Sequence, residues 1–355
     1  MRFRDVGGSV GYLQHGPLNA ITDVPGVKVG QAEAVGNDPF VMRSGATVIW
    51  PHGGNPDFER VFAGIDILNG YGEMTGRTTI EEWGLLGSPV VLTNTRSVGQ
   101  GYEAVIQFMN ALDPGIGDLD VLMPVVAECD DGYLNDNRGP AVPLAVFEQA
   151  LREAQTGPVA EGSVGAGVGM QLFGFKGGIG TASRQVEVAG QTYTVGVLVN
   201  TNFGRKHQLI IKGHAVGQTL ADALPLTPDK EGSCIGIVAT DAPLLPHQLR
   251  RLAKRAGFGL VRTGSVGNDG SGELFLAFST ALHIPKQNSV PLHPVYLGDG
   301  LVWNEEPPLN VLFDATVEAS EEAVLNALVS AVTVTGRDNH ILRAFPVEQY
   351  KDLFR

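Results

Sequence analysis

Two adjacent residues, Gly232 and Ser233, could together support a covalent reaction. A serine hydroxyl attacks a carbonyl carbon poorly until a base takes its proton. If the peptide bond between the two residues is cut, Ser233 becomes a chain terminus, and its α-amino group has a reference pKa of about 7.7–8.0, near the pH at which a general base works best. Ser233 would then hold a nucleophile and a base on one residue. A Gly-Ser pair is also an ordinary turn signal, which is the simpler interpretation of the dipeptide alone.

The residues around this pair predict where the hydroxyl would stand. A polar segment broken by prolines, residues 224–230, comes before it, and the apolar run 234–239 predicts a buried strand that begins at Ser233. Glycine adopts backbone conformations closed to other residues, so Gly232 would let the hydroxyl approach the preceding carbonyl. Cys234 would point to the opposite face of the strand, which favours an apolar filler over a nucleophile.

A serine nucleophile also needs an acceptor for its proton and donors for the oxyanion. Ser271 and Glu273 lie two residues apart in a glycine-rich loop, and in an extended segment both side chains face the same way. The carboxylate could hold Ser271, and Ser271 could relay a proton from Ser233. Asn202 is the candidate oxyanion donor, because an amide NH₂ donates without depending on a protonation state. Asn200 is the near alternative, and a role confined to turns remains open for all of these residues.

Two acidic residues are candidates for substrate binding. Glu128 ends the apolar run 121–127, and a carboxylate at the mouth of a buried strand is a natural partner for the ammonium group of a substrate. A solvated acid at a strand end is the alternative. Asp130, two places later, would make the same pocket more polar and more acidic.

The elements that must position these residues alternate along the chain. Buried strands are expected at residues 46–50, 88–92, 193–199 and from 233. Helices are expected at residues 101–112, at 143–154, from Pro246, and behind Ser320 as N-cap with Gly336 ending it. This mixed order predicts a layered α/β protein.

Composition excludes several classes of function. The formal net charge is −13 with no basic stripe, which argues against a nucleic-acid partner. No apolar run is long enough for a membrane span and no apolar signal region starts the chain, so a cytoplasmic protein is expected. The two cysteines make no disulfide framework. The eight histidines show no paired metal spacing, and the Gly-rich stretch 165–169 lacks the strand–GxGxxG–helix context of a dinucleotide site. We expect neither metal nor cofactor.

Further motifs occur in order along the chain: NAITDVPGV (19–27), GAGVGM (165–170), KGGIGT (176–181), the segment 233–249, RTGS (262–265) and GSGE (270–273). Together they span nearly the whole sequence, which resembles the DmpA/BapA family of self-processing aminopeptidases, including L-aminopeptidase/D-Ala-esterases and β-peptidyl aminopeptidases. The resemblance implies one domain over residues 1–355, a four-layer αββα sandwich similar to N-terminal-nucleophile hydrolases with a different connectivity. It also implies a cut between Gly232 and Ser233, with the pieces 1–232 and 233–355 staying together in a tetramer of cut units.

By the same resemblance, Ser233, Ser271 and Glu273 match the catalytic set, and Asn202 matches the oxyanion asparagine. Glu128 matches an acidic residue that would hold the free amine of a small peptide or amino-acid amide or ester. Asp130 departs from the family, whose members tend to carry an aromatic residue there, and it puts substrate preference in doubt. Two other functions stay open: an acyl transferase resembling the ornithine acetyltransferases, which use threonine, and an uncut binding protein without activity.

Overall fold

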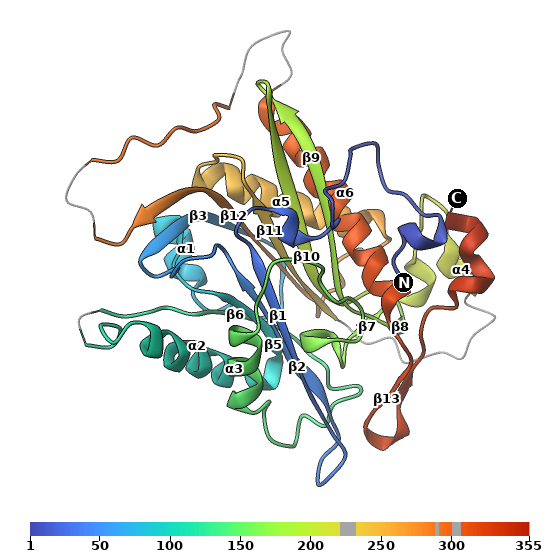
Figure 1. The fold of residues 1–355 in the computed structure, drawn as a ribbon. Helices are drawn as coiled ribbons and strands as arrows, with labels where there is room; N and C mark the ends of the chain where they lie inside the picture. Colours follow the sequence, from blue (N-terminus) through green and yellow to red (C-terminus); the bar gives the residue numbers. More distant parts are fainter. Residues whose placement is uncertain (119, 221–231, 288–290, 300–306, 355) are drawn as a thin grey trace.

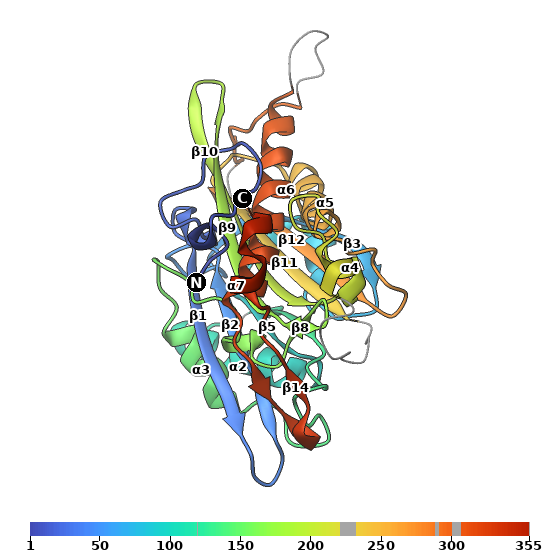
Figure 2. The ribbon, with the colours of Figure 1, turned by 90° about the vertical axis from the view of Figure 1, so that its right-hand side faces the viewer.

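The computed structural model describes residues 1–118, 120–220, 232–287, 291–299 and 307–354 (Figure 1). Two β-sheets face each other across a shared apolar core, and helices cover the outer face of each sheet. In both views α2 and α3 lie on one side of the sheets, and α5 and α6 lie on the other (Figures 1 and 2). This is the four-layer αββα sandwich expected from the sequence.

The smaller sheet has four strands in the order β1-β2-β5-β6. Their bounds are β1 (Lys28–Gly36), β2 (Met42–Trp50), β5 (Val90–Asn94) and β6 (Val125–Cys129). Its outer face packs against α2 (Val98–Leu112) and α3 (Leu144–Arg152). A core cluster that includes Val48, Val91 and Phe147 fills this layer, so the apolar face of each helix is buried on the sheet.

The larger sheet has six strands in the order β4-β3-β12-β11-β10-β9. Their bounds are β4 (Leu85–Leu86), β3 (Glu59–Gly70), β12 (Gly272–Pro285), β11 (Ser233–Thr240), β10 (Gln191–Asn202) and β9 (Gly178–Val188). Its outer face packs against α5 (Pro246–Arg262) and α6 (Pro308–Ser330). All eight residues of β11 are buried, because both faces of the central strand are covered.

Shorter elements join these layers. The helices are α1 (Arg77–Trp83), α4 (Val216–Leu220) and α7 (Val347–Tyr350), and two small sheets are formed by β7 (Gln171–Leu172) with β8 (Phe175–Lys176) and by β13 (Val334–Thr335) with β14 (Ile341–Leu342). The 3₁₀ turns are Arg4–Val6, Ile21–Asp23, Thr95–Ser97, Gly165–Gly167, Lys206–Gln208, Arg337–Asn339 and Lys351–Phe354. Within the described ranges, no helix combines the length and apolar character that a membrane-spanning helix needs.

Most elements expected from the sequence exist, with bounds shifted by a few residues. The strand expected from Ser233 and the helix expected from Pro246 begin at those residues, as β11 and α5. The proline-broken segment 224–230 lies outside the described residues. The Gly-rich stretch that resembled a nucleotide loop contains only a 3₁₀ turn, Gly165–Gly167.

The prediction for the last long helix was wrong. It begins at Pro308 and ends at Ser330, so Ser320 is a buried residue in mid-helix and Gly336 lies beyond the end. Glu322 is also buried, where its carboxylate pairs with the guanidinium of Arg184 at 2.7 Å. The error arose because buried ion pairs interrupt the apolar stripe, and the Ser-Glu-Glu sequence then imitates a capped helix start.

Candidate active site

The neighbouring ends of β10, β11 and β12 bring together the residues that the sequence singled out. Ser233 pairs with Asn202 in the antiparallel ladder of β10 and β11 and with Gly272 in the parallel ladder of β11 and β12. Ser271 immediately precedes β12, and Glu273 is its second residue. Residues at least thirty positions apart in the chain thus meet at one point of the larger sheet because of its strand order.

The Ser233 side chain is buried, with 5% of its surface exposed. Its Oγ has no hydrogen-bond partner in the part of the chain that the structure describes. A buried hydroxyl without a partner costs about 1–3 kcal/mol, so native proteins rarely keep one without a reason. A catalytic role, in which the hydroxyl must remain free to attack a carbonyl group, is such a reason.

Gly232 is fixed by a close approach of two strands. A Cβ on this residue would overlap the carbonyl oxygen of Asn202 and lie 2.8 Å from the Cα of Phe203. The structure thus adds a need for space to the conformational freedom expected of glycine at this position. The Gly232 carbonyl oxygen accepts a hydrogen bond from the Gly272 N–H at 3.1 Å, which polarises the carbonyl beside Ser233.

Ser271 and Glu273 form a buried pair. The Ser271 hydroxyl donates to Oε1 of Glu273, as the two-residue spacing predicted, and both side chains are almost fully buried. The Glu273 Oε2 atom has no partner among the described residues. Burial raises the pKa of Glu273, while the hydrogen bond from Ser271 opposes this effect. A carboxylate with a raised pKa and a spare oxygen is suited to accept a proton passed through Ser271.

The side-chain amide of Asn202 is held at both ends. Its Oδ1 accepts a hydrogen bond from the Gln171 N–H at 2.9 Å, and its Nδ2 donates to the Asp130 carbonyl oxygen at 2.8 Å. One N–H of the NH₂ group therefore remains for another acceptor. Asn200 lies two residues away on the same strand face, fully buried, and neither atom of its amide has a partner among the described residues. Both amides therefore have a free donor, and Asn202 is the one whose orientation is fixed by its other hydrogen bonds.

Glu128 lies on β6 in the smaller sheet, next to the segment that carries Gly72 and Glu73. Its Oε1 accepts from the Glu73 N–H at 3.1 Å, and its Oε2 accepts from the Thr95 hydroxyl. A Cβ on Gly72 would lie 3.5 Å from this Oε1 and 3.4 Å from the Cα of Gly272, so the Gly72 backbone lies between Glu128 and the start of β12, where Gly272 pairs with Ser233. Burial raises the pKa of Glu128, and the hydrogen bond from Thr95 opposes the rise.

Asp130 is exposed at the end of the same strand. Its Oδ1 accepts from Asn137 Nδ2 at 2.7 Å and from the Gly132 N–H at 3.1 Å, which fixes the carboxylate in the loop. Its backbone carbonyl holds Asn202. The residue therefore has a positioning contact with the candidate oxyanion donor in addition to its charge near Glu128.

Sequence reasoning missed the residues that support these groups. Glu73 and Thr95 come from connections between strands, where no periodic pattern reports their direction. Cys129 was also missed, and its thiol donates to the Asn200 carbonyl oxygen at 3.6 Å. Burial raises the pKa of the Cys129 thiol and Glu128 raises it further, whereas the nearby Ser233 hydroxyl, which lies outside hydrogen-bond geometry, lowers it. Cys129 is therefore an inert neighbour of the serine.

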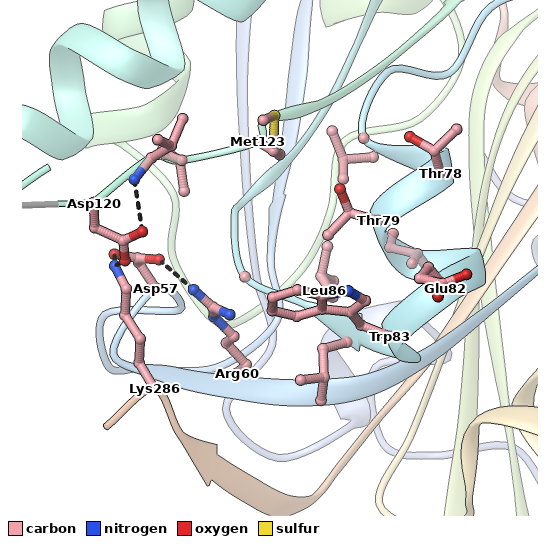
Figure 3. Close-up of a pocket in the computed structure, with 17 residues that line it drawn as sticks. Asp57, Arg60, Thr78, Thr79, Glu82, Trp83, Leu86, Asp120, Met123 and Lys286 are labelled. Carbon is pink, nitrogen blue, oxygen red and sulfur yellow. Dashed lines mark hydrogen bonds and ion pairs between the residues drawn. The ribbon is translucent and has the colours of Figure 1, made fainter. Parts of the chain in front are cut away.

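A cavity of about 760 Å³ lies apart from this group of residues. Its lining includes Trp83 and Leu86, and in Figure 3 the Lys286 ammonium is directed at the carboxylates of Asp57 and Asp120. None of the candidate site residues lines it. The volume of a cavity alone therefore does not locate the candidate active site in this protein.

The four-layer sandwich defines the class of protein as one with a variant of the Ntn hydrolase fold. Comparison with known proteins supports and narrows this assignment. The family model described as peptidase family S58 matches residues 19–342. The chain belongs to this family.

Relatives agree along almost the whole chain. The β-peptidyl aminopeptidase BapA of Sphingosinicella microcystinivorans is 41% identical over 364 residues, which cover 96% of this chain and 88% of the relative. A structure of the L-aminopeptidase D-Ala-esterase/amidase of Ochrobactrum anthropi, described as a variant of the Ntn hydrolase fold, matches with a TM-score of 0.88 at 41% identity, covering 98% of both chains. The PH0078 protein of Pyrococcus horikoshii OT3 matches with a TM-score of 0.93 at 41% identity, covering 99% and 98%. The fold class expected from the sequence is thereby confirmed.

Proposed function

We propose that this chain cuts itself between Gly232 and Ser233 and then acts as a serine aminopeptidase on the N-terminal amide or ester bond of small peptides and amino-acid derivatives. The observation that carries the proposal is the buried, unpartnered hydroxyl of Ser233 beside a carbonyl that already accepts a hydrogen bond. Membership of a peptidase family favours water over an amine as the final acyl acceptor.

The cutting step uses groups next to the bond. The Ser233 Oγ attacks the carbonyl carbon of Gly232, and its proton passes to Ser271 and Glu273. The hydrogen bond from the Gly272 N–H strengthens as the carbonyl oxygen becomes negative. The peptide nitrogen then leaves with a proton as the α-amine of Ser233, and an ester links Gly232 to the hydroxyl. Water hydrolyses this ester and releases the pieces 1–232 and 233–355 within one folded unit.

Turnover repeats the same chemistry on a substrate. Glu128 binds the substrate's ammonium group, which restricts attack to the first peptide, amide or ester bond. Ser233 attacks that carbonyl while its own amine and the Ser271–Glu273 pair handle the proton, and the free N–H of Asn202 stabilises the oxyanion. The leaving amine or alcohol departs, and water then hydrolyses the acyl-enzyme on Ser233.

The scope of substrates includes more than one backbone type. The Sphingosinicella relative is named as a β-peptidyl aminopeptidase and the Ochrobactrum relative as an L-aminopeptidase and D-Ala-esterase/amidase. We extend this range, α- and β-linked residues and simple amides or esters, to the present chain. We also keep a tetramer of cut units as a proposal, which light scattering of the purified protein tests.

The direct test of the proposed function is the state of the purified chain. Denaturing electrophoresis is expected to show two fragments, and their masses are expected to place the cut between Gly232 and Ser233. The purified protein, not denatured, is expected to release p-nitroaniline from aminoacyl p-nitroanilides with no acyl acceptor added. A single full-length band would favour an uncut binding protein, and release that requires an acceptor would favour acyl transfer.

Asp130 gives a prediction about specificity. The exposed carboxylate near Glu128 adds a second negative charge to the amine-binding region, so substrates with a basic N-terminal residue are expected to be preferred. Asp130→Tyr keeps the backbone carbonyl that holds Asn202 and is expected to reduce this preference about 2- to 5-fold in kcat/KM, as loss of an exposed charge interaction would. Kinetics on a panel of aminoacyl p-nitroanilides measure the change. An unaltered order of preference would rule out this role.

A further inference from the structure

Three side chains with metal-binding atoms meet at the edge of the larger sheet, in a place that the proposed chemistry does not use. His52 follows β2, Glu59 begins β3, and His283 lies near the end of β12. Their candidate ligand atoms all lie within 4.8 Å of one another. No local spacing of histidines predicts this cluster, because His52 and His283 are far apart in the sequence and meet only where β3 pairs with β12.

The geometry of the three groups is compatible with a common ion. His283 Nδ1 lies 3.1 Å from Glu59 Oε2, and the imidazole rings of His52 and His283 have centroids 4.5 Å apart. Two ligand atoms on a tetrahedral zinc ion are separated by about 3.3 Å, given bonds of about 2.0–2.1 Å. His52 is buried, whereas Glu59 and His283 are exposed and can turn to close the remaining distance.

The hydrogen bonds of His52 fix its tautomer. Its Nε2 lies 2.6 Å from the Glu59 carbonyl oxygen, which can only accept, so Nε2 carries the proton. Its Nδ1 accepts from the Gly54 N–H at 3.0 Å, so this atom carries no proton and has the lone pair that a metal ion needs. A histidine ligand in metalloproteins has this arrangement, with the second ring nitrogen donating to a backbone carbonyl.

We propose that His52 Nδ1, His283 Nδ1 and the Glu59 carboxylate form a binding site for a divalent transition-metal ion such as Zn²⁺, with water completing the coordination. Two imidazoles and one carboxylate suit zinc, cobalt, nickel or copper, whereas Mg²⁺ and Ca²⁺ prefer sites made of oxygen atoms. On binding, the metal replaces the Gly54 N–H as the partner of Nδ1, and the short loop around Gly53 and Gly54 absorbs this movement.

A bound ion would stabilise the fold by joining three segments of the chain. Glu59 pairs with Pro285 where β3 meets the end of β12, and the ladder between these strands is interrupted between Phe278 and His283. A metal ion that joins His283 to Glu59 and His52 would secure β12 beyond this irregularity. Because the ion binds the folded chain only, it raises the unfolding temperature as its concentration rises.

Cobalt titration of the full-length protein, stripped of metal with a chelator, tests the site. Four-coordinate Co²⁺ gives visible absorption bands much stronger than those of six-coordinate Co²⁺, so the spectrum reports the coordination as well as the affinity. We expect one ion per chain, displacement by Zn²⁺, and a Zn²⁺-dependent rise in unfolding temperature that Mg²⁺ does not produce. The exposed His283→Ala variant is expected to fold normally and to weaken binding about 100-fold or more, and Glu59→Gln is expected to weaken it about 10-fold or more.

His247→Ala is the matched control, because His247 is an exposed histidine on α5 that pairs with Asp299 and has no part in the cluster. It is expected to bind cobalt like the unaltered protein. Equal affinity of the His283→Ala variant and the unaltered protein would overturn the proposal, as would the absence of saturable binding. If metal-free His283→Ala unfolds at a lower temperature than the unaltered protein, the Glu59→Gln titration decides in its place.

Discussion

Ser233→Ala is expected to yield a single chain of 355 residues that is folded and inactive. The substitution removes one atom, the Oγ that attacks both the Gly232 carbonyl and the substrate. Turnover is expected to fall by about 10⁴-fold or more, as when a catalytic nucleophile is removed from other serine hydrolases. Because this hydroxyl has no hydrogen-bond partner among the described residues, its removal breaks no bond of the fold. The unfolding temperature of the uncut chain is therefore expected to stay unchanged or to rise.

The matched control for this experiment is Ser320→Ala. Ser320 is also buried, and its Oγ also lacks a partner among the described residues, but it lies in α6 on the outer face of the sheet. Its variant is expected to be cut and to turn over substrate normally. Electrophoresis, fragment masses, p-nitroanilide kinetics and thermal unfolding compare the two variants. Two fragments from Ser233→Ala, or substantial turnover by it, would contradict the role of this serine.

The sequence predicts that Ser233 begins a buried strand, because three local signals agree at this residue. A glycine precedes it, an apolar β-branched run follows, and a first-turn proline opens the next helix at Pro246. The spacing of Ser271 and Glu273 likewise predicted their hydrogen bond, since period-two geometry is local. The juxtaposition of β10, β11 and β12 is not local, and the family resemblance implied only that Ser233, Ser271, Glu273 and Asn202 act together.

Other features of the site and the fold depend on contacts between residues far apart in the sequence, which local sequence patterns do not report. The need for glycine at position 232 comes from the approach of the Asn202 backbone, which belongs to another strand. Thr95 and Glu73 hold Glu128 from two separate connections. The start of α6 was misjudged because buried acids in a helix resemble exposed ones until their arginine partner is known.

Glu128→Gln is expected to separate substrate binding from self-cleavage. The scissile bond at Gly232 has no ammonium group beside it, so the variant is expected to cut itself like the unaltered chain. For a substrate with a free amine, loss of the charge in a buried pair costs about 2–5 kcal/mol, and kcat/KM is expected to fall by about 30-fold or more, mainly through KM. Glutamine keeps the shape of the side chain: its oxygen can accept from the Glu73 N–H, and its NH₂ can donate to the Thr95 hydroxyl oxygen in place of the present bond.

The direction of the pKa shift gives this prediction a second measurement. Burial raises the pKa of Glu128, so in the free enzyme its carboxylate takes up a proton at a higher pH than an exposed glutamate does. Only the ionised form attracts the ammonium group, and KM of the unaltered enzyme is therefore expected to rise as the pH falls through this raised pKa. The variant has no such group and is expected to lose this part of the pH dependence, while any effect of the Ser233 amine remains.

Glu73→Gln distinguishes a specific ion pair from a general loss of charge. Glu73 is adjacent in space, and its N–H binds Glu128, but its own side chain is exposed. Exposed charges are screened by water and salt, so this variant is expected to change kcat/KM less than about threefold. Equal losses in both variants would mean that net charge attracts the substrate. A large loss confined to Glu128→Gln, with cleavage intact, would mean that this carboxylate contacts the amine, because no other step of the reaction distinguishes the two glutamates.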